Sequence, residues 1–377
     1  MSDSRAGGRI ECLDGLRGLA ALWVLVGHAH ILTGFKVPVI GDPELGVDLF
    51  IMLSGFLMVF HYQRRRGREP WEATSTWVTF WVRRYFRIAP LYYVMLVAAL
   101  TLGPFIYDAR MVIDAFNGVP PQLASRYLDS SLSNYLAHFS FLFGVSRSYS
   151  FRTALPDWSI GLEMQFYAAL PFIMLIVGRV GWIKGITGVA ALGALAAYLS
   201  HRIGYTFVMP TFLPLKMHVF AAGMLLAGAL WTNERRAYLF AGFAGYLVIA
   251  PLGGEMDWLH QITRIVLVLT FFALIHTARL PSAAAKMARP VSEWLGNRFF
   301  HNLGELSFGA YLVHLLIMQP VIAYLIGAVD VSAPVRWALT LLITVPIVYA
   351  LAWVGYNFIE MPGQNIGKEL TKPRASA

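Results

Sequence analysis

Cysteine and charged residues are both scarce in this sequence. Cys12 is the only cysteine among the 377 residues, so no disulfide can form within the chain, and the redox compartment is not indicated. Charged residues make up only 14% of the chain, hydrophobic residues make up 57%, and the mean hydropathy is +0.58. The polar intervals are too short to hold a folded domain of typical size. These proportions argue against a soluble domain and indicate a polytopic membrane protein.

Several motifs that would indicate other chemistries are missing. The sequence has no cluster with metal-ligand spacing, no glycine loop that cradles phosphate and no GxSxG elbow. The formal net charge of +9 could suggest a nucleic-acid partner, but the Lys and Arg residues cluster at the ends of apolar segments rather than on one basic surface. We therefore expect no bound metal and no nucleic-acid partner, and we expect membrane lipids to surround the chain.

Apolar segments of about 20 residues recur along the whole chain, as in proteins with many membrane-spanning helices. We predict an all-α bundle of about ten transmembrane helices, forming one membrane domain over residues 15–359. Residues 1–14 and 360–377 are then cytoplasmic segments at the two ends. The first apolar segment has no clear cleavage site and should stay attached. The predicted spans are 15–35, 46–62, 88–107, 159–178, 185–202, 212–231, 238–253, 262–279, 305–327 and 334–357.

The positions of the basic residues orient the chain in the membrane. With the N-terminus in the cytoplasm, 20 of the 30 Lys and Arg residues fall in inner loops or ends, among them Arg5, Arg9 and Arg374. Both termini should then be cytoplasmic. The longest outer interval, Tyr107 to Asp157, contains an apolar piece at 135–144 that is too short to cross the membrane. We expect this piece to lie along the surface or to enter as a half-helix packed against protein.

The first apolar segment carries Arg17 near its start and His28 near its end. Eleven residues at about 100° each leave the two side chains within roughly 20° of one helix face, and a rise of about 1.5 Å per residue separates them by roughly 16 Å. His30 falls on the other side of the helix. Two interpretations remain open. Either Arg17 is an interfacial residue and His28 packs between helices, or both face a cavity where His28 transfers protons near neutral pH.

Three arginines lie together just before the third span. Arg83 and Arg87 are an i,i+4 pair, so two guanidinium groups can converge on one ligand, and Arg84 lies between them. Guanidinium binds phosphate through a bidentate fork, as a nucleotide-containing cofactor on the cytoplasmic side would require. The alternative is that these charges only orient the chain and contact lipid headgroups.

Further polar residues lie inside or next to the apolar spans. Glu163 lies about one turn into the fourth span, where it could orient a histidine or form part of a helix start. Asp48 is either a substrate-binding residue or an acid favoured by the helix dipole. Tyr311 and His314 share an inward helix face, where they could bind substrate or link helices. For Glu360, neutralisation of a nearby arginine is the better interpretation.

Six segments in order resemble the acyltransferase-3 family of integral-membrane O-acyltransferases. They are LDGLRGLAALWVLVGH, GVDLFIMLSGFLM, RRYFRIAP, PDWSIGLEMQFY, SFGAYLVH and FIEMP, and they cover nearly the whole chain. A small departure is Ile51, where the family usually has Phe. Some members carry an additional extracellular SGNH hydrolase-like domain, and this sequence resembles the forms that act through the membrane domain alone or with a separate partner.

The resemblance implies ten spans and transfer of an acetyl group from cytoplasmic acetyl-CoA to a hydroxyl of a glycan or glycolipid at a bacterial inner membrane. It assigns catalysis to His28 with Glu163 and Arg17, and coenzyme A binding to Arg83, Arg84 and Arg87. The substrate-binding candidates are Asp48, Tyr311 and His314. Polysaccharide-assembly proteins are possible partners. An exporter, or an accessory subunit of glycan synthesis without transferase chemistry, is the alternative to an enzyme.

Overall fold

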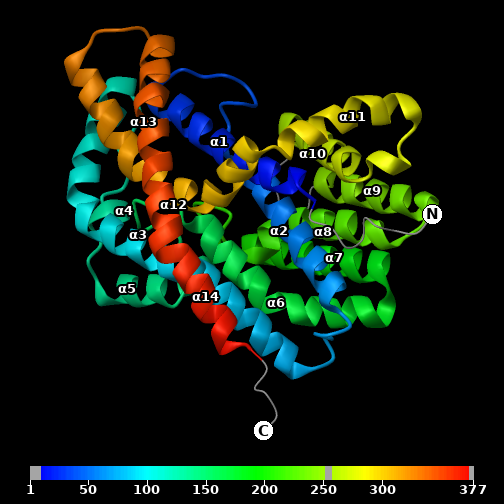
Figure 1. Cartoon of the computed structure of the whole chain (residues 1–377). Helices are drawn as coiled ribbons and strands as arrows, with labels where there is room; N and C mark the ends of the chain where they lie inside the picture. Colours follow the sequence, from blue (N-terminus) through cyan, green and yellow to red (C-terminus); the bar gives the residue numbers. More distant parts are fainter. Residues whose placement is uncertain (1–9, 251–256, 373–377) are drawn as a thin grey trace. The chain divides into compact units, whose positions relative to one another are not determined.

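The computed structural model describes residues 10–250 and 257–372, and within them the regular structure is helical throughout (Figure 1). Arg5, Arg9, Arg374 and the last residues of the predicted span 238–253 lie outside the described residues. The main helices are α1 (Cys12–Thr33), α2 (Pro43–Arg65), α3 (Thr74–Asn117), α6 (Trp158–Val180), α7 (Trp182–Arg202), α8 (Leu213–Gly228), α9 (Glu234–Ile249), α10 (Trp258–Ile275), α11 (Ser282–Leu295), α12 (Arg298–Ala328) and α13 (Ala333–Gly355). Shorter ones are α4 (Ser125–Leu128), α5 (Leu132–Phe139) and α14 (Met361–Leu370), with 3₁₀ turns at Leu142–Val145, Ala229–Trp231 and Thr277–Arg279 and a π-helical turn at Tyr356–Glu360.

Each predicted span falls on one of these helices. Nine helices in the described part of the chain are long and apolar enough to cross a membrane. The remaining predicted span corresponds to α9, which has 16 residues before the chain reaches residues outside the description. The prediction of an all-α, multi-pass membrane protein is therefore confirmed.

Helix α3 is much longer than the predicted span 88–107. It has 44 residues, which is about 66 Å of helix and roughly twice the thickness of the hydrocarbon core. The arginines at its start lie within the helix, because Arg is a good helix former and the apolar pattern marks only the part in lipid. The interval after it contains only short helices, and α5 with its eight residues cannot cross a membrane, as predicted.

The chain folds as two compact units, each built from segments far apart in sequence. The first unit comprises the residues up to Ala20, Glu44–Trp77 and Gln165–Glu305. The second comprises Ala21–Pro43, Val78–Met164 and the residues from Leu306 onward.

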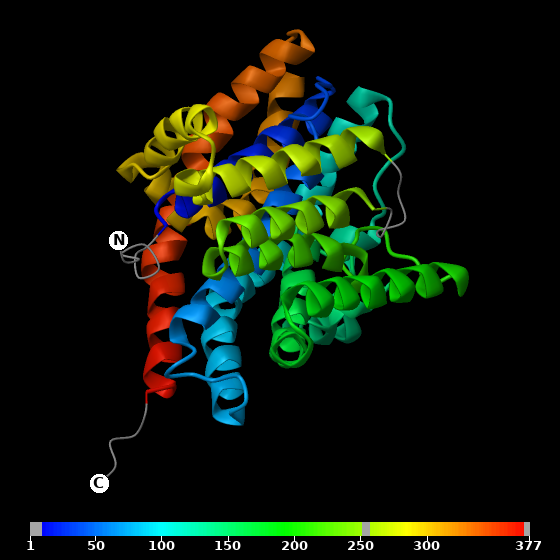
Figure 2. The same cartoon turned by 90° about the vertical axis from the view of Figure 1, so that its right-hand side faces the viewer.

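In the first unit, α7, α8 and α9 lie side by side (Figures 1 and 2). Helices α2 and α8 approach closely because each presents a glycine to the other. A Cβ atom on Gly55 would collide with the carbonyl of Phe220, and one on Gly223 would collide with the carbonyl of Met52. Small residues at such crossings allow helix backbones to pack closely in membranes.

In the second unit, the C-terminal half of α1 packs with α12 and α13 around a buried apolar cluster that includes Leu25, Ala29, Val313 and Val348. Helix α14 continues from α13 through the π-helical turn, and the run from α13 to α14 can be followed in orange to red in Figure 2. Gly363 and Gly367 of α14 lie against α3, next to Pro90 and Phe86. This packing places the C-terminal helix beside the arginines of α3.

Candidate active site

Two histidines from distant parts of the sequence face each other in the second unit. His28 of α1 and His314 of α12 have ring centroids 4.9 Å apart, and His28 Nδ1 lies 3.2 Å from His314 Nε2. His314 is fully buried, whereas His28 is partly exposed. The structure therefore brings together a residue predicted to be catalytic and a residue predicted to bind substrate.

Hydrogen bonds to backbone carbonyls assign the protons of both rings. His28 Nδ1 lies 2.9 Å from the carbonyl oxygen of Val24, and His314 Nδ1 lies 2.6 Å from that of Tyr311. A carbonyl oxygen can only accept, so both Nδ1 atoms carry hydrogen. His314 Nε2 is then unprotonated, and its lone pair accepts a hydrogen bond from His28 Nδ1–H. His28 Nε2 also carries an unprotonated lone pair and makes no hydrogen bond to a described residue, so it can accept a proton from a substrate.

His30 supports the choice of His28 by contrast. It is 2% exposed, its Nδ1 bonds to the carbonyl of Phe35 at 2.5 Å, and its ring stacks on Trp337 with centroids 4.8 Å apart. These contacts are those of a packing residue. The helical phase of the two histidines predicted this difference.

Tyr311 connects the histidine pair to the start of α6. Its hydroxyl donates to the carbonyl of Pro156 at 2.5 Å and accepts from Ser159 Oγ at 2.8 Å. Because the Tyr311 carbonyl also fixes His314, one residue joins the PDWS segment to the paired rings. Tyr311 therefore positions His314 in this structure, and its predicted contact with substrate stays a prediction.

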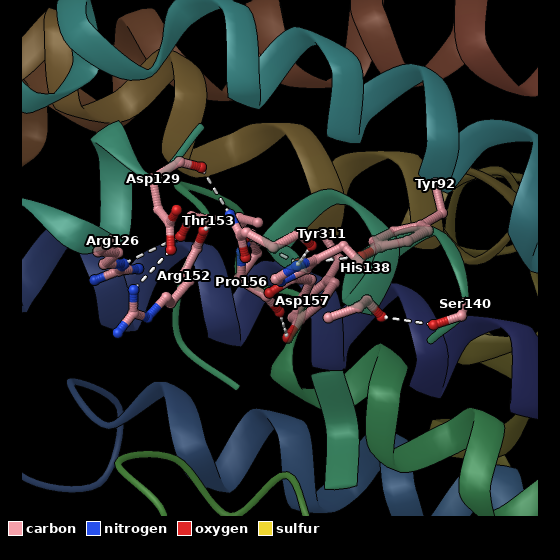
Figure 3. Close-up of polar contacts among 12 residues, drawn as sticks. Tyr92, Arg126, Asp129, His138, Ser140, Arg152, Thr153, Pro156, Asp157 and Tyr311 are labelled. Carbon is pink, nitrogen blue, oxygen red and sulfur yellow. Dashed lines mark hydrogen bonds and ion pairs between the residues drawn. The ribbon is translucent and has the colours of Figure 1, made fainter. Parts of the chain in front are cut away.

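Asp157 is buried and holds the same PDWS segment in place through its side chain. Its Oδ2 accepts from Thr153 at 2.9 Å and from Tyr92 at 3.2 Å, and lies 3.7 Å from His138 Nε2. Figure 3 shows these groups, with Arg126 and Arg152 at one end and Tyr92 and Ser140 at the other. Burial raises the pKa of the Asp157 carboxyl, although His138 and the hydrogen bonds from Thr153 and Tyr92 act in the opposite direction.

The other two predicted catalytic residues, Glu163 and Arg17, are half-buried. Glu163, in α6, interacts electrostatically with Tyr311. The hydrogen bonds that fix the His28 ring come from Val24 and His314, so a tautomer-fixing role for Glu163 stays a prediction. Arg17 lies on the same unbroken helix as His28, as predicted, and belongs to the first compact unit.

Asp48 lies in a buried charge cluster of the first unit. It is fully buried and accepts from Lys216 Nζ at 2.8 Å and from Arg264 Nε at 2.6 Å. Lys216 also pairs with Glu44, the acid in the first turn of α2. Ion pairing explains the burial of Asp48, which lies beyond the first turn where a helix dipole acts most strongly. Its predicted contact with substrate stays a prediction.

The arginine cluster of α3 is half-buried and packs with the C-terminal helix. Arg87 pairs with Glu360 at 3.5 Å, which confirms the predicted neutralisation of an arginine by Glu360. Arg83 Nε donates to Thr371 Oγ1 at 2.9 Å, and the Arg84 guanidinium lies 5.9 Å from the centroid of the Phe80 ring. Coenzyme A binding by these residues stays a prediction. Among the described residues, no three His, Cys, Asp or Glu side chains are grouped so as to hold a metal.

Sequence reasoning did not identify two of the buried groups near this site, His138 and Arg126. Both lie in the interval between α3 and α6, where the helices are short. The one signal in the sequence that pointed to His138 is its position inside the short apolar piece 135–144, where a histidine would be buried.

Comparisons with known proteins give a consistent result. The family described as acyltransferase domain matches residues 10–353. Peptidoglycan O-acetyltransferase OatA of Listeria monocytogenes is 23% identical over 94% of this chain, and the chain spans 55% of that relative's length. Nodulation protein 10 of Rhizobium leguminosarum bv. viciae is 26% identical over 100% of this chain and 99% of its own length. Acyltransferase MdmB of Streptomyces mycarofaciens is 24% identical over 82% of this chain and 79% of its own length. No solved structure matches the chain.

Proposed function

Because the chain belongs to the acyltransferase domain family (acyltransferase-3), which matches residues 10–353, we propose that it transfers an acetyl group from cytoplasmic acetyl-CoA to a hydroxyl of a glycan or glycolipid. We place this reaction in a bacterial inner membrane, with the acceptor at the outer face. The similarity to OatA, a peptidoglycan O-acetyltransferase, supports a glycan acceptor. The observation that carries the proposal is the His28–His314 pair, with a free Nε2 on His28.

In this proposal His28 is the general base. The acceptor oxygen attacks the acetyl carbonyl carbon while its proton passes to His28 Nε2. The imidazolium that forms is held by hydrogen bonds from Nδ1–H to Val24 and His314, both of which are acceptors. The C–S bond of the thioester then breaks, and the proton returns to the departing thiolate. Glu163 and Arg17 remain candidates for stabilising charge along this route.

Coenzyme A binding is assigned to the arginines of α3. Three guanidinium groups within five residues of one helix match the several phosphates of coenzyme A, because each can form a bidentate contact. Arg87 and Arg83 are already held in place by Glu360 and Thr371, which limits the ordering that a ligand would have to impose.

Transfer of radiolabelled acetyl groups in inverted membrane vesicles tests the proposal. Vesicles that contain the chain should move label from acetyl-CoA into the glycan fraction, and His28→Ala should lower the rate by about 10²- to 10⁴-fold. His201→Ala, at an exposed position near the end of α7, is the control. Unchanged labelling by a well-expressed His28→Ala variant would refute the assignment of His28 as the base.

The same assay separates the alternative functions. An exporter would move glycan without consuming acetyl-CoA, and a structural subunit of a polysaccharide-assembly complex would tolerate changes at both Arg17 and His28. The paired histidines favour the enzyme over the structural subunit, because intramembrane ionisable groups are costly and are usually kept for chemistry or transport.

A further inference from the structure

Arg126 is a buried cation in the outer interval, on the short helix α4. Its side chain is 8% exposed, its Nε donates to the carbonyl of Thr153 at 3.3 Å, and its guanidinium lies 3.9 Å from the centroid of the Phe151 ring. The ring stack recovers part of the hydration that burial removes, as a cation over an aromatic face does. A ring does not supply hydrogen-bond acceptors in the guanidinium plane.

Neighbouring arginines have the carboxylate that Arg126 lacks. Arg110 bonds to Asp114 at 2.7 Å, and Arg152 bonds to Asp129 at 2.6 Å. Among the described residues, no carboxylate lies within ion-pair distance of Arg126, and neither of its Nη atoms hydrogen bonds to protein. A buried guanidinium with two unused donor groups is complementary to an incoming oxyanion.

Arg126 also lies close to the proposed catalytic pair. Its neighbour Tyr127 donates to Gln319 Oε1 at 3.1 Å, and Gln319 lies on α12 five residues after His314. Arg126 is moreover one of the charged groups that act electrostatically on His28. In the predicted topology, an anion bound by Arg126 lies on the outer side of the histidines, where the proposed acceptor arrives.

We propose that Arg126 binds an anionic group, a carboxylate or phosphate, carried by the acceptor sugar, so that the acceptor is an acidic glycan. This inference rests on the proposed function, since it names the class of its acceptor. Asp157 and Asp114 act on Arg126 electrostatically but form no ion pair with it, because Asp157 is held by Thr153, Tyr92 and His138 and Asp114 pairs with Arg110. The site thus adds a contact that selects substrates by charge.

Equilibrium binding to the purified full chain in nanodiscs tests the site without requiring turnover. The probes are a trimer of galacturonate, a phosphorylated maltotriose and neutral maltotriose, which distinguish carboxylate, phosphate and uncharged sugar. The wild-type chain should prefer at least one of the acidic probes over maltotriose. Arg126→Gln should weaken binding of that probe by about tenfold or more, and Arg126→Lys should weaken it less, because Lys keeps the charge but loses the fork.

Two control variants separate this site from general loss of charge or packing. Arg147→Gln removes an exposed cation from the same interval, and Arg336→Gln removes another buried guanidinium, which lies 4.2 Å from the centroid of the Phe116 ring. Both should bind the acidic probe as the wild type does.

Several outcomes would overturn the inference. One is a wild-type chain that does not distinguish acidic from neutral sugar, a result that needs no variant to fold. Equal binding by Arg126→Gln and wild type is another, and equal weakening by Arg126→Gln and Arg336→Gln is a third, because it would show a packing role. Acidic-sugar binding that depends on Arg126 in a chain that transfers no acetyl group would refute the proposed function and leave the anion site standing.

Discussion

At the scale of single residues, the ring of His314 can only accept at the atom that faces His28, because its Nδ1–H is donated to the Tyr311 carbonyl. In the proposed reaction, His314 therefore serves as a hydrogen-bond acceptor for His28 and not as a second base. We expect His314→Gln, whose amide oxygen can accept, to keep most of the transfer rate. His314→Leu should lower kcat by about 2- to 12-fold, because His28 Nδ1–H keeps the Val24 carbonyl and loses only its second acceptor, a loss of about 0.5–1.5 kcal/mol.

The comparison requires kcat from vesicles with equal amounts of protein. His30→Gln is the matched control, since His30 lies on the same helix but packs against Trp337 away from the pair. Equal rates for His314→Gln and His314→Leu would show that the contact with His28 has no role in the reaction.

At the scale of helices, the charge cluster around Asp48 links α2, α8 and α10. Lys216 and Arg264 share one fully buried carboxylate, so Asp48→Asn leaves two cations with too little negative charge. Breaking a buried ion pair in this way typically costs about 3–5 kcal/mol. We expect a clearly lower midpoint of thermal unfolding in detergent for Asp48→Asn.

Asp330→Asn, in the exposed loop between α12 and α13, provides the control. The double variant Asp48→Leu with Lys216→Met should recover part of the loss, because it removes a cation together with the acid. A variant Asp48→Asn as stable as wild type would mean that the cluster contributes little, and would return Asp48 to consideration as a substrate contact.

The outer interval between α3 and α6 should respond to acid through Asp129. Burial alone would raise the pKa of this carboxyl, but hydrogen bonds from Ser131 and from Arg152 lower it more strongly, so the folded pKa lies below the unfolded value. The stabilisation is therefore complete above the unfolded pKa of about 4 and is lost as pH falls through the folded pKa. Wild type should resist proteolysis of this interval better than Arg152→Gln at neutral pH, and the difference should vanish in strong acid. A difference that is independent of pH would contradict the assignment.

Helices and their contacts were not equally predictable from the sequence. The spans could be predicted because apolar runs of membrane length are a local property. The pairing of His28 with His314 could be anticipated only as two inward faces, because 286 residues separate them. Asp157 and His138 belong to an interval of short helices and loops, and their approach depends on how that interval folds back on α3. The same holds for Arg126, whose burial no local pattern indicates.

At the scale of the whole molecule, three ion pairs agree with the predicted topology, in which successive helix ends alternate between the outer and the inner face. Asp48, Lys216 and Arg264 lie within the first two turns of α2, α8 and α10, which the predicted topology starts at the outer face. Arg87, in the first half of α3, pairs with Glu360 after α13, and the topology places both at the inner face. An odd number of membrane crossings between any of these partners would separate them by the thickness of the bilayer.

The absolute orientation can be measured by cysteine labelling, because Cys12→Ala alone gives a chain without cysteine. Single cysteines are then placed at two exposed loop positions, as Gly67→Cys between α2 and α3 and Ser130→Cys between α4 and α5. With cytoplasmic termini, a membrane-impermeant maleimide should label Ser130→Cys in intact cells and Gly67→Cys only after permeabilisation. Asp330→Cys serves as a second outer position and should follow Ser130→Cys. The reverse pattern would invert the molecule and place the proposed acceptor site around Arg126 in the cytoplasm, where an outer-face glycan could not reach it.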